Sequence, residues 1–176
     1  MAVVNAYVDT NVVAGKLSSA ALVGGVPVIR AIQSFAIGAS DSASSVYRVF
    51  KGIPSDAIVL SIKILNEAVA GVTAGLIGLY NVLDFDGKGA IIGSGNQLCA
   101  GFNFSSANII ANVPAEALTA VAVANREKQL WELASQTQAP GAAGPKAPAY
   151  DICLTMASMT TNTANICVIM DYVRGV

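Results

Sequence analysis

The chain has 176 residues, of which 54% are hydrophobic and only 12% are charged, about half of the charged share that is usual in a soluble domain. Its length is sufficient for one domain with its own core, so neither a disulfide framework nor a structural metal is required. The net charge of −1 excludes a strong electrostatic attraction to nucleic acid. The absence of histidine excludes a Ser-His-Asp triad, a Cys-His dyad and a histidine metal centre.

Residues 1–21 begin the chain with an irregular segment that is rich in small residues and poor in charge. No basic stretch precedes its apolar residues, so we expect no secretory signal and a protein that is made and kept in the cytosol. We interpret residues 1–21 as an N-terminal arm or edge segment, followed by a single domain over residues 22–176.

Two strand signals come next. Residues 26–36 form a β-branched, alternating run, and a second alternating run over residues 46–51 leads to Pro54, which cannot continue a central ladder. Alternation in the second run places Arg48 and Phe50 on the same face of the strand. For Arg48 we expect a cross-strand charge partner or solvent rather than a ligand.

Residues 58–80 are apolar and long enough to cross a bilayer as a helix. Lys63 and Glu67 would then lie near the bilayer midplane, at a high cost in free energy. A period of two predicts a strand instead, and one face of that strand carries Ile58, Leu60, Ile62 and Ile64. Gly71 and Gly75 interrupt the run, so we predict two strands joined by a short connection and no membrane span.

A Gly- and Asp-rich stretch over residues 81–97 predicts an extended loop before a strand at residues 98–104. Its glycines lack the spacing of a phosphate-binding loop. Asp84 and Asp86 resemble the start of a calcium loop, but Lys88 stands where a third oxygen ligand is expected, so we do not favour a bound ion.

One helix is predicted, over residues 122–134, where Lys128 and Glu132 would pair on the wet side. Trp131, the single tryptophan, is expected in the core or at a subunit contact rather than stacked on a base. The Pro- and Ala-rich residues 136–149 predict a surface loop or arm.

Two further strand runs, over residues 150–157 and 165–173, suit a terminal hairpin. Many short strands and one short helix favour an all-β fold: an antiparallel β-sandwich or jelly roll with extended loops or arms. A parallel α/β fold would need helices between the strands.

Candidate catalytic, cofactor-binding and metal-ligating residues do not emerge from the sequence. Cys99, Cys153 and Cys167 lack CxxC spacing, so we interpret them as small buried thiols. Nothing selects one pair among the eleven acidic residues for glycosidic chemistry. We therefore expect a protein that is not an enzyme and takes no cofactor. With so few charges, much of its exterior is expected to be covered by other subunits.

Three stretches of the sequence carry a resemblance to a known family. These are VYRVFKGIPSDAIVLSIKILNEAVAGVTAGLIGLYNV, REKQLWELA and AYDICLTMASMTTNTANICVIMDYV. In this order they resemble a group of tailed-bacteriophage virion proteins, in which a YR strand precedes an IP turn and a final hairpin ends the chain. The resemblance covers residues 46–173, and its motifs are structural rather than catalytic.

The resemblance implies a capsid decoration (cement) protein of the jelly-roll type. Such a protein would sit on the capsid exterior of the virion after synthesis in the host cytoplasm. Its partners would be the phage major capsid protein, whose neighbouring subunits it clamps, and further copies of itself in a dimer or trimer. Neither nucleic acid nor membrane would be a partner. Residues 1–21 and 136–149 would be the arms that reach across subunit junctions.

Two other interpretations remain open. A tail, neck or fibre-associated virion component could have the same composition and would differ in copy number per particle. A carbohydrate-binding jelly roll is the other, and it would present several exposed aromatic residues on one face. Here aromatic residues make up 6% of the chain and are scattered singly.

Overall fold

The computed structural model describes the greater part of the chain. The described residues are 3–4, 22–23, 26–39, 41, 45–82, 91–107, 115–116, 128–134, 149–156, 159 and 163–174. The loop with Asp84 and Asp86 lies outside these residues, as does almost all of the two expected arms.

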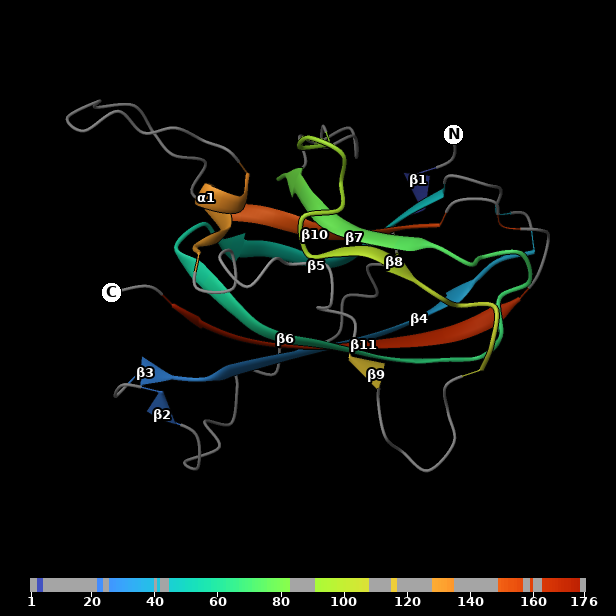
Figure 1. The fold of residues 1–176 in the computed structure, drawn as a ribbon, viewed down its shortest axis with the longest axis horizontal. Helices are drawn as coiled ribbons and strands as arrows, with labels where there is room; N and C mark the ends of the chain where they lie inside the picture. Colours follow the sequence, from blue (N-terminus) through green and yellow to red (C-terminus); the bar gives the residue numbers. More distant parts are fainter. Residues whose placement is uncertain are drawn as a thin grey trace.

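The described strands form two main sheets that pack face to face (Figure 1). The first sheet has the order β1 (Val3–Val4), β5 (Ser45–Pro54), β10 (Ala149–Met156), β7 (Gly75–Asn81) and β8 (Cys99–Phe102). The second sheet has the order β4 (Ile29–Ile37), β11 (Ala164–Arg174), β6 (Ala57–Asn66) and β9 (Ala115–Glu116). A third, two-stranded sheet pairs β2 (Leu22–Val23) with β3 (Val26–Pro27).

From β4 to β9, consecutive strands alternate between the two sheets except for β7 and β8, which are neighbours in the first sheet. β10 and β11 then lie between strands that come earlier in the sequence. β10 lies between β5 and β7, and β11 lies between β4 and β6. This is the strand order of a jelly roll. Apart from the parallel contact of β1 with β5, the pairings are antiparallel. The predicted all-β sandwich is confirmed.

Period-two alternation builds the core between the sheets. On β10 every second side chain enters the core, and these residues are Tyr150, Ile152, Leu154 and Met156. From the facing sheet Ile166, Val168 and Met170 of β11 meet them. Phe35 of β4 stacks on Tyr47 of β5 with ring centroids 5.3 Å apart, which joins the two sheets near one end.

The prediction of two strands over residues 58–80 is confirmed, because β6 and β7 occupy this stretch. The prediction for the faces of β6 is wrong at its start. Asp171 of β11 lies opposite Ser61 and the next residue, Tyr172, lies opposite Val59, so Leu60 is an extra residue in a β-bulge. Ile62 and Ile64 therefore point into the core as expected, whereas Leu60 is 38% exposed.

β5 departs from simple alternation for the same reason. Arg48 lies opposite Cys153 and Phe50 opposite Ile152, so Val49 is an extra residue and both Val49 and Phe50 enter the core. The expected shared face of Arg48 and Phe50 is therefore wrong. A second irregularity follows at Gly52, which has φ 64°, a backbone conformation that favours glycine. The strand ends at Pro54, as predicted.

Of the helix predicted over residues 122–134, residues 122–127 lie outside the described part of the chain, Lys128 and Gln129 are not helical, and the last turn is confirmed. Within the described residues, α1 spans Leu130–Leu133 and closes one end of the sandwich, with Leu130 fully buried. Lys128 precedes the helix, so the expected pair with Glu132 is wrong. The Glu132 carboxylate instead accepts a hydrogen bond of 2.8 Å from the Gln129 N–H and caps the helix start.

None of the helical residues that the structure describes forms a segment with the length and hydropathy of a membrane span. Ala149, placed in the predicted Pro- and Ala-rich loop, is the first residue of β10. The division of the chain at residue 21 stays a prediction, because β1 is the only part of residues 1–21 that is described.

Candidate interaction surface

Asp151 of β10 is a fully buried carboxylate on the face of the first sheet that points away from the core. It accepts a hydrogen bond of 2.8 Å from the Gly52 N–H through Oδ1. Its Oδ2 lies 3.0 Å from the Arg48 Nε, in an ion pair whose two side chains are 10% exposed or less. The expected cross-strand charge partner of Arg48 is therefore confirmed, and it holds the bulged part of β5 against β10.

Part of the remainder of this face is also buried. Val46, Tyr80 and Cys153 form a small buried cluster of their own. The hydroxyl groups of Tyr80 and Thr155 lie 3.0 Å apart and share a hydrogen bond. Burial raises the pKa of the Cys153 thiol to about 12. Such a protonated thiol is a poor nucleophile, and this face contains no reactive cysteine.

The segment that leads into β8 forms hydrogen bonds along the edge of β7. The Ile92 and Leu98 N–H groups donate to the Leu79 and Ile77 carbonyls at 3.0 Å each. Between these two bonds the Gln97 side chain accepts a hydrogen bond of 3.1 Å from the Leu79 N–H in place of a backbone carbonyl. Gly78 makes this possible, since a Cβ there would lie 2.1 Å from the Gly95 backbone.

The second sheet carries a polar row across its three long strands. Arg30 of β4 holds Asp171 of β11 by two hydrogen bonds, Nε to Oδ1 at 2.7 Å and Nη2 to Oδ2 at 2.9 Å. Ser61 of β6 donates to Oδ2 at 3.2 Å. These contacts, with that from Arg30 the largest, hold the pKa of Asp171 below its usual value. The carboxylate is fully occupied by its own sheet.

Beyond this row the described residues of the same face are largely apolar and partly exposed. We call it the outer face and define it by the outward-pointing residues of β4, β11 and β6, which are Arg30, Ile32, Ser34, Ala36, Asn165, Cys167, Ile169, Asp171, Ser61, Lys63 and Leu65. Ile32 and Ile169 are cross-strand neighbours, and the Ile32 side chain is 56% exposed. Cys167 lies beside Ser34 and Leu65. In the described part of the chain the outer face therefore offers a partly exposed apolar strip for contact with another protein.

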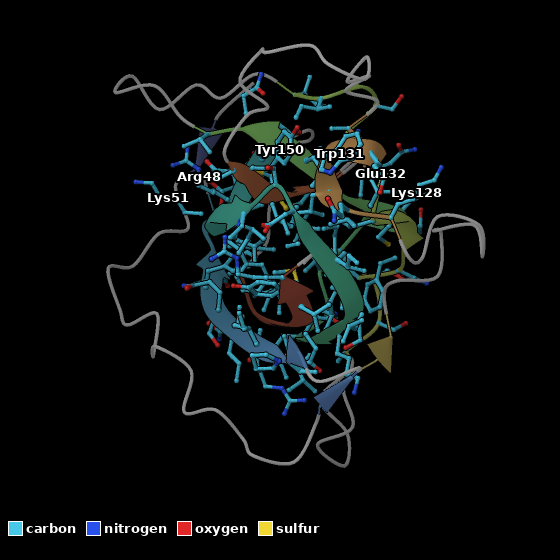
Figure 2. The ribbon with its side chains drawn as sticks, turned by 90° about the vertical axis from the view of Figure 1, so that its left-hand side faces the viewer. Arg48, Lys51, Lys128, Trp131, Glu132 and Tyr150 are labelled. Atoms are coloured by element: carbon cyan, nitrogen blue, oxygen red, sulfur yellow. The ribbon has the colours of Figure 1, made fainter. Side chains whose placement is uncertain are left out.

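The residues that the sequence singled out do not converge on a reaction centre. Figure 2 shows Arg48 and Lys51 on one side of the molecule and Trp131, Glu132 and Lys128 on the other, with Tyr150 between them. Trp131 is half-buried and packs against the core, which agrees with its expected role. Across the described part of the chain, no group of three or more Cys, Asp or Glu side chains could hold a metal ion.

The expected burial of the thiols is confirmed for Cys99 and Cys153, whereas Cys167 is only half-buried on the outer face. Sequence reasoning missed the exposed Ile32. Its signal was the alternation of Arg30, Ile32, Ser34 and Ala36 on one side of the run, but alternation does not say which face is covered.

No protein-family model and no curated protein matches this sequence. Among solved structures, the chain is similar to one described as "Cyanophage Pam1 capsid asymmetric unit", with a TM-score of 0.52 and 14% sequence identity. The alignment covers 94% of this chain and 98% of the other. At this level of identity the likeness concerns the fold, and it extends over nearly the full length of both chains.

Proposed function

We propose that the protein is a structural component of a bacteriophage virion, and within that class a capsid decoration protein that clamps neighbouring major-capsid subunits from outside. The observation that carries the proposal is the similarity of fold, over almost the whole chain, to a chain of the cyanophage capsid asymmetric unit. The resemblance of residues 46–173 to tailed-phage virion proteins is independent support from the sequence.

The surface chemistry agrees with an assembly role. The outer face exposes Ile32 beside Ile169, and the chain has a net charge of −1, so copies of it do not repel each other strongly. Arg48 forms a buried ion pair with Asp151, and Arg30 forms an ion pair with Asp171. These charged groups therefore have partners within the fold. A rigid sandwich repeated by capsid symmetry resists outward pressure through many modest contacts. In this role the protein performs no catalysis and needs no cofactor.

The large exposed hydrophobic residues of the described part are Ile32, Leu60, Val82 and Ile91, none of which is aromatic. A carbohydrate-binding jelly roll would present aromatic rings for stacking on sugars. This difference favours the virion role over the carbohydrate-binding one. A tail or neck component differs from a decoration protein in copy number, which the experiment below measures.

The test is binding of the purified protein to expanded capsids that lack it. We expect saturable binding at a copy number in proportion to the capsid subunits, together with a higher temperature of particle disruption. Capsids that already carry the protein are the matched control and should take up none. An absence of binding, with only a handful of copies per virion in a stained gel, would instead assign the chain to the tail or neck.

A further inference from the structure

β4 is an edge strand without the usual protection against pairing. It runs for nine residues, Ile29–Ile37, in unbroken register with β11 and without a bulge. Among the strands that the structure describes, only β11 pairs with it. Natural edge strands are commonly short, bulged or marked by proline and lysine. β4 contains none of these features, and its one charge, Arg30, is neutralised by Asp171.

Hydrogen bonds on the neighbouring strand show which backbone groups of β4 point to the open edge. The Asn165 carbonyl accepts from the Glu67 N–H at 3.0 Å, and the Asn165 N–H donates to the Glu67 carboxylate at 2.7 Å. The backbone groups of Asn165 thus face β6, and those of the next residue, Ile166, face β4. In an antiparallel ladder this direction alternates from residue to residue.

The partners of the β11 residues that face β4 are Ile29, Ala31, Gln33 and Phe35. These four use their backbone groups in the ladder with β11. The N–H and C=O groups of Arg30, Ile32, Ser34 and Ala36 therefore point to the open edge. The Gln33 side-chain amide donates to the Ser34 carbonyl at 3.1 Å, which fits an edge acceptor that no described strand uses.

We propose that this edge pairs with β4 of a second copy of the chain, antiparallel and with the two-fold axis at Gln33. Gln33 is the middle residue of β4, so this register uses the whole strand. Ile32 lies opposite Ser34 of the copy and Arg30 opposite Ala36, and every edge group gains a partner. The four-stranded sheets of two copies then form one continuous sheet. The proposal rests on the self-association included in the proposed function and specifies its surface.

Charge and polarity favour a second copy as the occupant. The register never places Arg30 opposite another cation, and the paired Asp171 removes its attraction for an acidic peptide. Gln33 belongs to the inward-facing series of β4 with Phe35 and Ile37, yet it is polar and only half-buried. At the two-fold axis two Gln33 amides would lie side by side and could bond to each other. The exposed Ile32 residues would extend the apolar strip of the outer face across the junction.

The register is tested by crosslinking. In it the two copies of residue 33 form a non-hydrogen-bonded pair, with Cα atoms about 4.5 Å apart, which is within disulfide range. A Gln33→Cys, Cys167→Ser variant should form a disulfide-linked dimer under mild oxidation. The matched control is Ala31→Cys, Cys167→Ser, since Ala31 shares the face and the half-buried state of Gln33. Its two copies would lie about 13 Å apart, so it should stay uncrosslinked.

The edge is tested by substitution. Ser34→Pro removes an edge N–H without removing a donor to β11, and it should raise the dimer dissociation constant at least about tenfold while the melting temperature stays close to that of the parent. Ile32→Lys should act in the same direction. Leu60→Lys is its control, because Leu60 is also exposed but lies on β6, away from the edge. Light scattering after size exclusion gives the mass for each variant.

A dimer that crosslinks through residue 33 and dissociates with Ser34→Pro supports the proposal, whether or not the protein binds capsids. A monomer at all concentrations overturns it, as does an oligomer that neither edge substitution weakens. A dimer that crosslinks through residue 31 instead overturns the register. Capsid binding by a protein that stays monomeric would retain the proposed function and reject this edge.

Discussion

The Asp151 carboxylate is the most deeply buried acid in the part of the chain that the structure describes, and its partners are few. Arg48 forms an ion pair with it and the Gly52 N–H donates a hydrogen bond to it, so removal of its charge leaves a guanidinium that is 10% exposed without a counter-charge. We expect Asp151→Ala to lower the free energy of unfolding by about 3–5 kcal/mol in urea denaturation.

Asp56→Ala is the control for this substitution. Asp56 pairs with Arg174 at 3.6 Å, and both side chains are more than a third exposed. Exposed pairs of this kind contribute little, so the expected change is below about 1 kcal/mol. Equal losses for the two variants would show that the buried pair has no special role in stability.

The three thiols differ in their environment and should differ in reactivity. Burial raises the pKa values of Cys99 and Cys153, whereas Cys167 is half-buried on the outer face. A disulfide reagent at pH 8 should therefore modify one thiol per native chain and three after denaturation, and Cys167→Ser should abolish the fast reaction. Rapid modification of two thiols in the native protein would contradict the burial of Cys99 or Cys153.

The bulge in β6 has a consequence for how neighbouring positions tolerate truncation. Simple alternation gives Leu60 and Ile62 the same face, but the bulge exposes Leu60 and leaves Ile62 fully buried. Ile62→Ala should cost about 2–5 kcal/mol of unfolding free energy through lost burial and a cavity. Leu60→Ala should cost less than about 1 kcal/mol. Similar costs at both positions would indicate an unbulged strand.

Gly78 of β7 shows how a position in a strand can depend on a loop that packs against it. Gly78 is needed because the loop that carries Gln97 crosses against its backbone. Gly101 of β8 is also in a strand, but a Cβ there would meet nothing within 4 Å. The two positions look alike in the sequence, and only the path of the crossing loop makes one of them indispensable.

For the molecule as a whole, the titrating groups predict a broad plateau of stability. The chain has no histidine, so no unperturbed side chain titrates between about pH 5 and 8. On the acid side, the lowered pKa of Asp171 contributes stability that is present above its unfolded pKa of 3.8 and lost as the pH falls through the folded value.

At alkaline pH the stability changes in the opposite direction, and it falls as the pH rises. Burial raises the pKa of Cys153 from 9.0 to about 12 and that of Tyr47 above its usual 10.0. The unfolded chain releases these protons first, so stability falls as the pH rises above about 9. Urea denaturation from pH 3 to 11 should show a flat region between two declines, and Asp171→Asn should reduce the acid decline. A maximum confined to one narrow pH range would contradict this expectation.

The sequence alone predicts the all-β class, the position of nearly every long strand and the end of β5 at Pro54, because period-two alternation and proline chemistry are local properties of the chain. It could not determine which residues face the core after a bulge. Leu60 and Val49 are extra residues only relative to β11 and β10, strands that lie far along the chain.

The same limit applies to the surface. The run over residues 26–36 was readable as a strand, but only the order of the sheet decided that β4 stands at an edge while β11, with a similar pattern, lies between two neighbours. The partner of Arg48 was equally hidden, since Asp151 is distant in sequence and adjacent only after β10 inserts beside β5. Which groups remain unpaired, and are therefore available for assembly, depends on non-local pairing that no local pattern encodes.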